Sequence, residues 1–449
     1  MKRNINCCHF VWLLLLLLLT LQAMPSESWQ AKFAPAKLQL HMETSAQVQL
    51  TLTDIEPALL ESPERYSFRL SSDHVELASV AAENASISMQ QVMQQQWSGA
   101  IHVLAHFLGE ARIAVRLHDA QSNTSRAPGN AQAAESRLLA QVVRPERVLD
   151  HIFVGSIILL MSLIYINFGA ALKLDVLQGL VTRPVGPCIG FITQVVGMPL
   201  LSYALGVFIF PESPSMQLGL FFTGIAPSGG ASNTWSAVLN GNIHLSVLMT
   251  TVSNVAAFAS MPLWIFTLGQ LIFERAGLLV PYGKIASYCA SLIVPLLIGL
   301  AIQRWLPRVA RVLVRLLKPI SACLILFIIV FAIITNYYLF QLFSWQIAVA
   351  GLSLPGLGYI VAWLAAKLLN QNAADALTIA IETGIQNTGI AIFLLRTVLD
   401  QPQGDITTVV PVSVAIMTPL PLLGIYLYQR IYNGAKAGVI DTAEHQRIV

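Results

Sequence analysis

The sequence predicts an all-α polytopic membrane protein with nine transmembrane helices and a small β-rich domain before them. Three observations lead to this fold class. The chain of 449 residues is 55% hydrophobic and only 11% charged, whereas soluble domains average about 25% charged residues. After residue 150, apolar runs recur at lengths of roughly 20, which a helix needs to cross the hydrocarbon core. Before residue 150, apolar and polar residues instead alternate along the chain.

Residues 1–23 have the composition of a secretory signal peptide. Lys2 and Arg3 precede an apolar stretch from Val11 to Thr20, and Ala23 offers a small residue for cleavage. An uncleaved anchor helix is the alternative. Both interpretations deliver the following segment to the outside of the cell.

Residues 24–149 are predicted to form an extracytoplasmic, sandwich-like β domain. "KLQLHMETSAQVQLTLTD" and "ARIAVRLHD" alternate with a period of two, which is typical of half-buried strands. The polar stretch 121–136, "QSNTSRAPGNAQAAES", is interpreted as a linker. Asn84 and Asn123 each begin a glycosylation sequon, which fits an outside location. This segment contains no cysteine, so a disulfide framework is excluded.

Residues 150–432 are predicted to form a nine-helix membrane domain, followed by a cytoplasmic tail at 433–449. Loops assigned to the inside hold ten Lys or Arg residues, and those assigned to the outside hold three, namely Arg275, Lys284 and Arg396, as the positive-inside rule requires. The N-terminus is therefore expected outside and the C-terminus in the cytoplasm. The plasma membrane is the expected location, and an internal membrane is the alternative. The predicted segments are 151–172, 186–210, 216–240, 243–273, 284–303, 319–341, 345–367, 375–397 and 406–430.

An internal repeat relates two groups of three segments. Pro-x-Leu-x-Tyr, then an Asn, then a second Pro recur in the same order and at similar spacing. The two groups are five segments apart, so they have opposite topology, and inverted repeats with interrupted helices indicate the binding site of a secondary transporter. Chance matching of prolines is the alternative. The landmarks are Pro199, Asn233 and Pro262 in one group, and Pro355, Asn387 and Pro419 in the other.

Glu382, within "ETGIQNTGIA", is the only acid inside a predicted span and away from its ends. A charge at the bilayer centre costs about 2.5–3.5 kcal/mol on insertion scales, and no Lys or Arg lies in the interior of a neighbouring predicted span. A bound cation would offset this cost. Gly384 and Gly389 weaken the helix, so that backbone carbonyls, with the amides of Gln386 and Asn387, become oxygen ligands. The alternative is a protonated Glu382 held by hydrogen bonds between helices.

A second interrupted segment runs from Gly224 to Asn233, "GIAPSGGASN". Pro227, Gly229 and Gly230 break a helix, and Ser228, Ser232 and Asn233 supply oxygen atoms. The alternative is a small-residue packing face. In the next segment Ser246 and Thr250 are four residues apart and share a helix face, although lone hydroxyls in membrane helices usually bond to their own helix.

Together, "APSGGASN", "GNIHLSVLMTTVSNVAAFASMPL" and "ETGIQNTGIA" resemble the bile acid:sodium symporter family over roughly residues 150–432. The chain looks closest to a subgroup with a signal peptide and a long ectodomain. The resemblance implies two broken helices that cross where they unwind, with two sodium ions behind the crossing. It assigns one ion to Ser232, Asn233, Ser246, Thr250 and Glu382, and the other to Glu382, Gln386, Gln194 and the carbonyls of Thr383 and Ile385. It places the substrate near Pro227, Gly229, Gly230 and Asn387.

The function expected from this resemblance is sodium-coupled symport of an organic anion by alternating access. The anion would be a bile acid, a steroid conjugate or a similar amphipathic molecule. Gly389 stands where animal bile-acid carriers often have a second Gln, and those carriers lack the ectodomain. Two alternatives stay open, namely proton coupling through Glu382 and a receptor that acts through its ectodomain. An enzyme, an organic cofactor and a nucleic-acid partner are not expected, because no His, Cys or second acid joins Glu382 and the net charge is only +3. The sequence does not indicate the oligomeric state.

Overall fold

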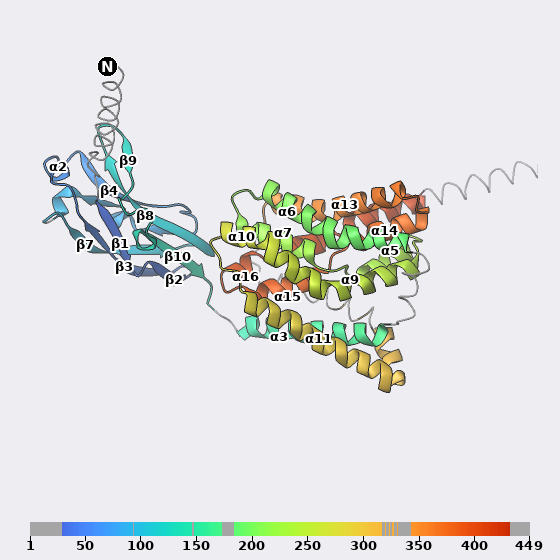
Figure 1. The fold of residues 1–449 in the computed structure, drawn as a ribbon. Coiled ribbons are helices and arrows are strands. Elements are labelled where there is room, and N and C mark those ends of the chain that lie inside the picture. The colour runs from blue at the N-terminus through green and yellow to red at the C-terminus, as the bar shows by residue number, and fades with distance from the viewer. Residues whose placement is uncertain are drawn as a thin grey trace, which may run out of the picture. The chain divides into compact units, whose positions relative to one another are not determined.

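The computed structural model describes residues 29–92, 94–145, 148–172, 184–316 and 343–431, together with residues 319, 323, 326 and 330. The predicted signal peptide, nearly all of the predicted sixth segment (319–341) and the predicted tail (433–449) lie outside the described residues. The chain forms two compact units that divide between Pro145 and Glu146 (Figure 1).

The N-terminal unit is a β-sandwich. One sheet has the strand order β1-β3-β7-β5 and the other β2-β10-β8-β4-β6, with β9 paired to β8. Alternate residues of both sheets, such as Phe33, Leu50 and Ile113, are fully buried and form one apolar core, as the period-two pattern predicts. The strands are β1 (Gln30–Ala34), β2 (Lys37–His41), β3 (Ser45–Thr53), β4 (Tyr66–Ser72), β5 (Ala78–Val80), β6 (Ser86–Ser88), β7 (Trp97–Ala105), β8 (Gly109–Asp119), β9 (Thr124–Arg126) and β10 (Arg137–Val143).

The polar stretch 121–136 is not a linker, so that prediction is wrong. It contains β9 and a short 3₁₀ helix (Ala134–Ser136), and it leads into the central strand β10. Asn130 fixes the stretch to the first strand, because its side chain accepts from the N–H of Ala31 and donates to the carbonyl of Ala31. Polar composition marked the segment as exposed, but these contacts make it part of the sandwich.

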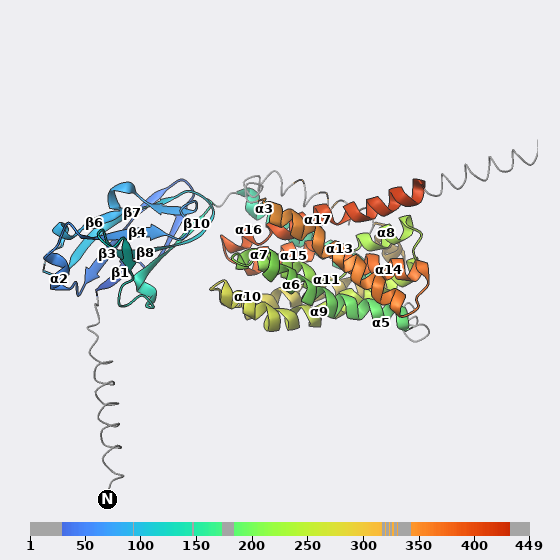
Figure 2. The same cartoon turned by 90° about the horizontal axis from the view of Figure 1, so that it is seen from above.

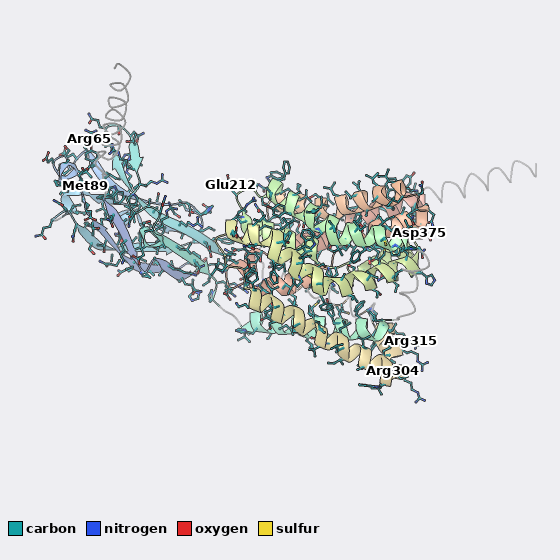
Figure 3. All side chains as sticks on the ribbon, viewed as in Figure 1. Arg65, Met89, Glu212, Arg304, Arg315 and Asp375 are labelled. Atoms are coloured by element: carbon teal, nitrogen blue, oxygen red, sulfur yellow. The ribbon has the colours of Figure 1, made fainter. Side chains whose placement is uncertain are left out.

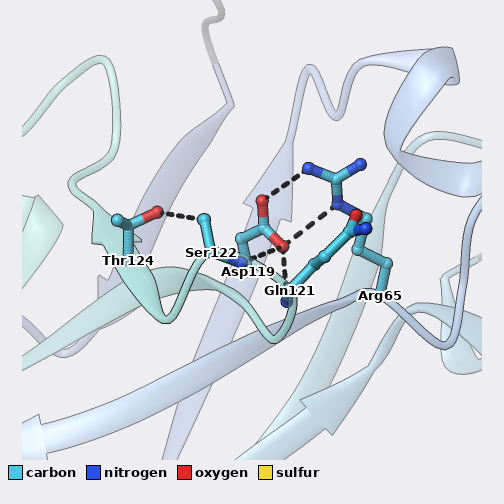
Figure 4. A network of polar contacts seen from close by, with 5 residues as sticks. All are labelled: Arg65, Asp119, Gln121, Ser122 and Thr124. Atoms are coloured by element: carbon cyan, nitrogen blue, oxygen red, sulfur yellow. Dashed lines mark hydrogen bonds and ion pairs between the residues drawn. The ribbon is translucent and has the colours of Figure 1, made fainter.

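An ion pair closes the turn that follows β8 (Figure 4). Arg65 donates Nε to Oδ1 of Asp119 at 3.1 Å and a terminal nitrogen to Oδ2 at 2.9 Å. Oδ1 of Asp119 also accepts from the backbone N–H of Gln121 at 2.9 Å. The Arg65 guanidinium and these backbone donors hold the pKa of the Asp119 carboxyl well below its usual range.

The two sequon asparagines differ in their surroundings. Asn123 is exposed in the turn between β8 and β9, with a left-handed φ of 52°. Asn84 is half-buried, and its Oδ1 accepts from the N–H of His102 at 3.1 Å. Its Nδ2, where a glycan would attach, takes no part in that bond.

The second unit is helical. Six of its described helices are long and apolar enough to cross a membrane, and each corresponds to a predicted segment: Val154–Ala171, Val185–Ile209, Ile243–Arg275, Tyr282–Trp305, Trp345–Leu368 and Gln403–Ile431. The predicted segments 216–240 and 375–397 are instead each interrupted near the middle. The number nine and the inverted repeat remain predictions.

Within the helical unit, α3 packs along α11 (Figure 1), and α13 lies between α14 and α17 (Figure 2). Two π-helical turns, η5 and η6, interrupt the second and third long helices. The elements are α3 (Val148–Ala171), α5 (Val185–Ile192), η5 (Thr193–Gly197), α6 (Met198–Ile209), α7 (Pro214–Ile225), α8 (Ala231–Val238), α9 (Ile243–Trp264), η6 (Ile265–Gly269), α10 (Gln270–Arg275), α11 (Tyr282–Trp305), α13 (Trp345–Leu368), α14 (Ala373–Gly384), α15 (Thr388–Val398), α16 (Gln403–Ile406) and α17 (Val409–Met417), with further helices at 307–316 and 419–431.

A buried ion pair corrects two expectations. Arg396, assigned to an outer loop, lies in the last turn of α15, and its side chain is 8% exposed; it pairs with Asp405 of α16, whose side chain is 1% exposed. Asp405 belongs to the apolar helix Gln403–Ile431, so Glu382 is not the only acid in a membrane-spanning helix. The mutual attraction of Arg396 and Asp405 offsets the cost of removing both charges from water. No local sequence pattern predicts that these two residues pair.

Candidate functional site

Two interrupted helices meet at their breaks. The first break lies between α7 and α8, and the second between α14 and α15. Their backbones form a short antiparallel bridge between Ser228 and Gln386. Gly229 donates its N–H to the carbonyl of Ile385, and Asn387 donates its N–H to the carbonyl of Pro227, both at 2.8 Å. Part of the backbone of each break is therefore hydrogen-bonded to the other break, and side chains bond further groups, such as the N–H of Ser228 with the hydroxyl of Ser253. Backbone groups at membrane depth need such partners.

The sequence explains where each helix stops. Ala226 is extended (φ −64°, ψ 153°), as residues before proline tend to be, so α7 ends there. Gly229 allows the two backbones to approach, because a Cβ at this position would lie 2.9 Å from the carbonyl oxygen of Gln386. The second break covers residues 385–387. Gly389 lies inside α15, so the expectation that it helps to open the helix is wrong.

The four helix ends give the crossing an uneven charge. The helices α8 and α15 begin there, at Gly230 and Asn387, and Asn387 caps α15 by accepting from the N–H of Ile390. The helices α7 and α14 end there. Helix N-termini carry partial positive charge and C-termini partial negative charge, so the crossing offers places for both an anion and a cation.

Glu382 lies in the last turn of α14 and is 1% exposed. Its Oε2 accepts from the hydroxyls of Ser228 and Thr250, each at 2.7 Å. Its Oε1 accepts from the hydroxyl of Ser246. No Lys, Arg or His forms an ion pair with Glu382 among the described residues. The carboxylate thus faces hydroxyl dipoles alone.

The first predicted ligand set converges on this carboxylate. Oδ1 of Asn233 lies 2.9 Å from the Ser246 hydroxyl oxygen, whose single proton it shares with Oε1 of Glu382. Asn233 donates to the Thr250 hydroxyl at 3.2 Å. Ser232 is fully buried beside Glu382, although its hydroxyl makes no hydrogen bond of standard geometry in the described structure. Its oxygen lone pairs could therefore face a cation in this cluster.

The second predicted set also comes together. Gln194 donates Nε2 to the carbonyl of Ala226 at 2.8 Å and to Oε1 of Gln386 at 2.9 Å. Gln386 in turn donates to the carbonyl of Thr383 at 2.6 Å. The carbonyl of Ile385 already accepts from Gly229 and keeps one lone pair. Thr193, which the sequence did not single out, bonds hydroxyl to hydroxyl with Thr383 at 2.9 Å.

A π-helical turn places Gln194. Such turns are rare and are frequent at functional sites. The turn η5 precedes Pro199, which has no N–H to donate to the carbonyl of Val195 four residues earlier. The indole N–H of Trp264, at the end of α9, donates to that carbonyl at 2.7 Å instead. The sequence flagged Pro199 as a landmark, but neither the π turn nor the role of Trp264 can be seen in it.

A small cavity opens beside Glu382, with room for roughly one water-sized sphere. Gln194, Ser228, Ser253 and Glu382, whose side chains all carry oxygen atoms, are among the residues that line it. Among the described residues, no three His, Cys, Asp or Glu side chains gather. Oxygen ligands of this kind suit a hard cation, and a single negative charge matches a monovalent one.

Known proteins similar to this chain are membrane transporters and a protein named only P3. The profile of the Sodium Bile acid symporter family matches residues 158–342. The chain is 30% identical to human P3 protein over 61% of this chain and 58% of that protein. It is 27% identical to the human ileal sodium/bile acid cotransporter over 68% of this chain and 90% of that protein. It is 29% identical to the mouse sodium-dependent organic anion transporter over 53% of this chain and 63% of that protein. The chain spans about three fifths of the length of the P3 proteins it matches.

Proposed function

We propose that this integral, multi-pass membrane protein couples the entry of sodium to the uptake of an organic anion, because its residues 158–342 match the sodium bile acid symporter family and the chain is similar to a sodium/bile acid cotransporter. The observation that carries the proposal is the buried Glu382 carboxylate, which has hydroxyl partners but no positive side chain among the described residues. A co-transported sodium ion supplies the missing positive charge.

The proposed sodium ligands fall into two groups around the same carboxylate. The first uses the oxygens of Ser232, Asn233, Ser246, Thr250 and Glu382. The second uses Glu382, Gln386, Gln194 and the carbonyls of Thr383 and Ile385. In the absence of sodium the hydroxyls turn their protons toward Glu382; on binding, their lone pairs face the ion instead. Sodium therefore replaces a set of hydrogen bonds and locks the two breaks against each other.

The organic anion is assigned to the side of the crossing where α8 and α15 begin. Their N-termini, near Pro227, Gly229, Gly230 and Asn387, offer partial positive charge to an acidic group. The names of two relatives refer to bile acids and to organic anions. The proposed substrate is therefore an amphipathic anion such as a bile acid or a steroid conjugate. Access to this site alternates between the two sides of the membrane as one bundle of helices rocks against the rest.

The orientation is proposed from charge. Arg304, Arg315 and Asp375 lie toward one end of the helical unit and Glu212 toward the other (Figure 3). The arginine-rich end is assigned to the cytoplasm by the positive-inside rule. The β-sandwich is then outside, in the plasma membrane, and a glycan is expected on the exposed Asn123 and on Asn84.

Uptake measurements test the proposal. Cells expressing the full chain are given labelled bile acids, steroid sulfates and other organic anions in sodium or in choline medium. Uptake above background is expected only in sodium, and Glu382→Ala at equal surface level abolishes it. The control is Glu212→Gln, since Glu212 is an exposed carboxylate. Full uptake by Glu382→Ala would refute the proposed coupling.

Two alternative functions have observations in their favour. A buried carboxylate with hydroxyl partners also suits proton coupling, in which case uptake follows the pH gradient and ignores sodium. The folded β-sandwich suits a receptor, in which case deletion of residues 24–148 abolishes function. Sodium-driven uptake that survives this deletion excludes the receptor reading and makes the sandwich accessory.

A further inference from the structure

A cationic surface lies at the end of α11, separate from the crossing. Helix α11 ends at Trp305, because Leu306 is not helical (φ −128°, ψ 63°). Pro307 then begins a second helix at 307–316. Four exposed arginines surround this change of direction: Arg304, Arg308, Arg311 and Arg315. Arg304 and Arg315 lie toward the same end of the unit (Figure 3).

The short helix is amphipathic in a particular way. Arg308, Arg311 and Arg315 follow the spacing i, i+3, i+7 and share one face. Val309, Val312 and Leu316 have the same spacing, form the adjacent stripe and are 44%, 54% and 43% exposed. Ala310, on the remaining side, is 6% exposed and packs against the protein. An apolar stripe therefore faces outward between the arginines and the packed side.

Among the described residues, the four arginines have no acidic partner. No Asp or Glu occurs in the sequence between Glu274 and Asp375, and none of the four arginines forms an ion pair within the described part of the chain. Asp375 is engaged elsewhere, by the amide groups of Asn242 and Asn372. The positive charge of this surface is thus available to an external anion.

We propose that the surface formed by residues 304–316 binds the anionic headgroups of the membrane leaflet in which α11 ends. Trp305 is 77% exposed at the end of a spanning helix, where tryptophan anchors at the interface. The stripe of Val309, Val312 and Leu316 enters the boundary of the acyl chains, as in interfacial helices. The guanidinium groups alongside bind headgroup phosphates in pairs of hydrogen bonds.

The proposal is independent of what the protein transports. Clusters of basic residues next to a membrane helix attract anionic lipids, most strongly those with several phosphates. Each arginine near the surface contributes about fivefold in affinity, so three of them contribute about a hundredfold. The cytoplasmic orientation proposed above places this surface at the leaflet that is rich in such lipids.

Binding of short-chain lipids to the purified full-length protein tests the proposal. The probes are eight-carbon phosphatidylinositol bisphosphate, eight-carbon phosphatidylcholine and free inositol trisphosphate, titrated into the protein in a neutral detergent. We expect the anionic lipid to bind at least tenfold more tightly than phosphatidylcholine. The triple variant Arg308→Gln, Arg311→Gln, Arg315→Gln binds it about a hundredfold more weakly. The matched control replaces Arg69, Arg112 and Arg116, three exposed arginines of the β-sandwich, and keeps the wild-type affinity.

Three results would overturn the proposal. The first is a triple variant that binds the anionic lipid as tightly as the wild type does. The second is a control variant that loses as much affinity as the triple variant, which would mean that net charge alone matters. The third is free inositol trisphosphate that binds as tightly as the lipid, which would make the surface a site for a soluble phosphate. A salt series on the wild type needs no variant, and a rise from 50 to 500 mM salt must weaken binding several-fold.

Discussion

Replacing Trp264 with phenylalanine removes one hydrogen-bond donor from the helix pair beside Gln194. The indole N–H of Trp264 donates to the carbonyl of Val195. Pro199, four residues after Val195, has no N–H and cannot donate to this carbonyl. Phenylalanine keeps an aromatic ring but has no N–H. The carbonyl is then left without a partner in a helix that crosses hydrocarbon, where no water replaces the lost donor.

The expected magnitude follows from this single bond. An unpaired buried polar group costs about 1–3 kcal/mol. The indole satisfies a carbonyl of the π turn that holds Gln194, so we expect the cost to fall on the conformation that aims Gln194 at Gln386. A population shift of this size weakens apparent sodium binding by about 5- to 150-fold. The melting temperature falls as well.

The assay is thermal unfolding of the purified protein over a sodium titration at constant ionic strength, which gives the melting temperature and the half-saturating sodium concentration separately. The control is Trp305→Phe, because Trp305 is 77% exposed and distant in sequence from the π turn η5. We expect only Trp264→Phe to raise the half-saturating concentration. A lower melting temperature with an unchanged sodium midpoint would mean that Trp264 is structural only and would refute the reasoning.

Three further predictions concern other contacts. Asp405→Asn leaves the Arg396 charge buried without its partner and lowers stability by about 3–5 kcal/mol, more than joint replacement of both residues by leucine; equal losses in thermal unfolding would contradict this. Ser246→Ala removes a hydroxyl at Glu382, and a loss of about 1.5 kcal/mol raises the half-saturating sodium concentration roughly tenfold, while Ser291→Ala, on an exposed helix face, leaves it unchanged. Because the folded pKa of Asp119 is lowered, its contribution to stability is present above the unfolded value near 4 and is lost as pH falls. The stability difference between the wild type and Asp119→Asn therefore shrinks below about pH 4 in unfolding measurements, and a constant difference would exclude the ion pair as its cause.

The sequence predicted much of the membrane unit because hydrocarbon imposes a length and a composition on each helix. Six apolar runs became long helices. Pro227 and Gly229 marked the first break correctly, since proline and glycine act on the backbone locally. The second break carries no proline, and there Gly389 misled, because α15 continues through it. Local composition also misplaced the polar stretch 121–136, whose contacts with the first strand are not local.

Parts of the site depend on contacts between distant segments and could not be predicted. The bond between Thr193 and Thr383 joins residues 190 positions apart. The hydrogen bond from Trp264 to Val195 requires that the end of α9 packs beside η5 with the indole N–H next to the Val195 carbonyl. Glu382 was found because an acid in an apolar run is conspicuous in sequence, whereas a lone Trp or Thr is not.

The most direct test of the central claim is the effect of sodium on the thermal stability of the purified wild type, compared with choline at equal ionic strength, and repeated with Glu382→Gln. A ligand that binds only the folded state stabilises it by about 2.7 kcal/mol at a hundredfold excess over its Kd. The glutamine variant lacks a charge whose attraction to an ion at about 4 Å amounts to about 4 kcal/mol at an effective dielectric constant of 20. The account predicts a sodium-specific rise in melting temperature that this variant loses. No sodium effect in a folded wild type, or an undiminished effect in Glu382→Gln, would contradict it.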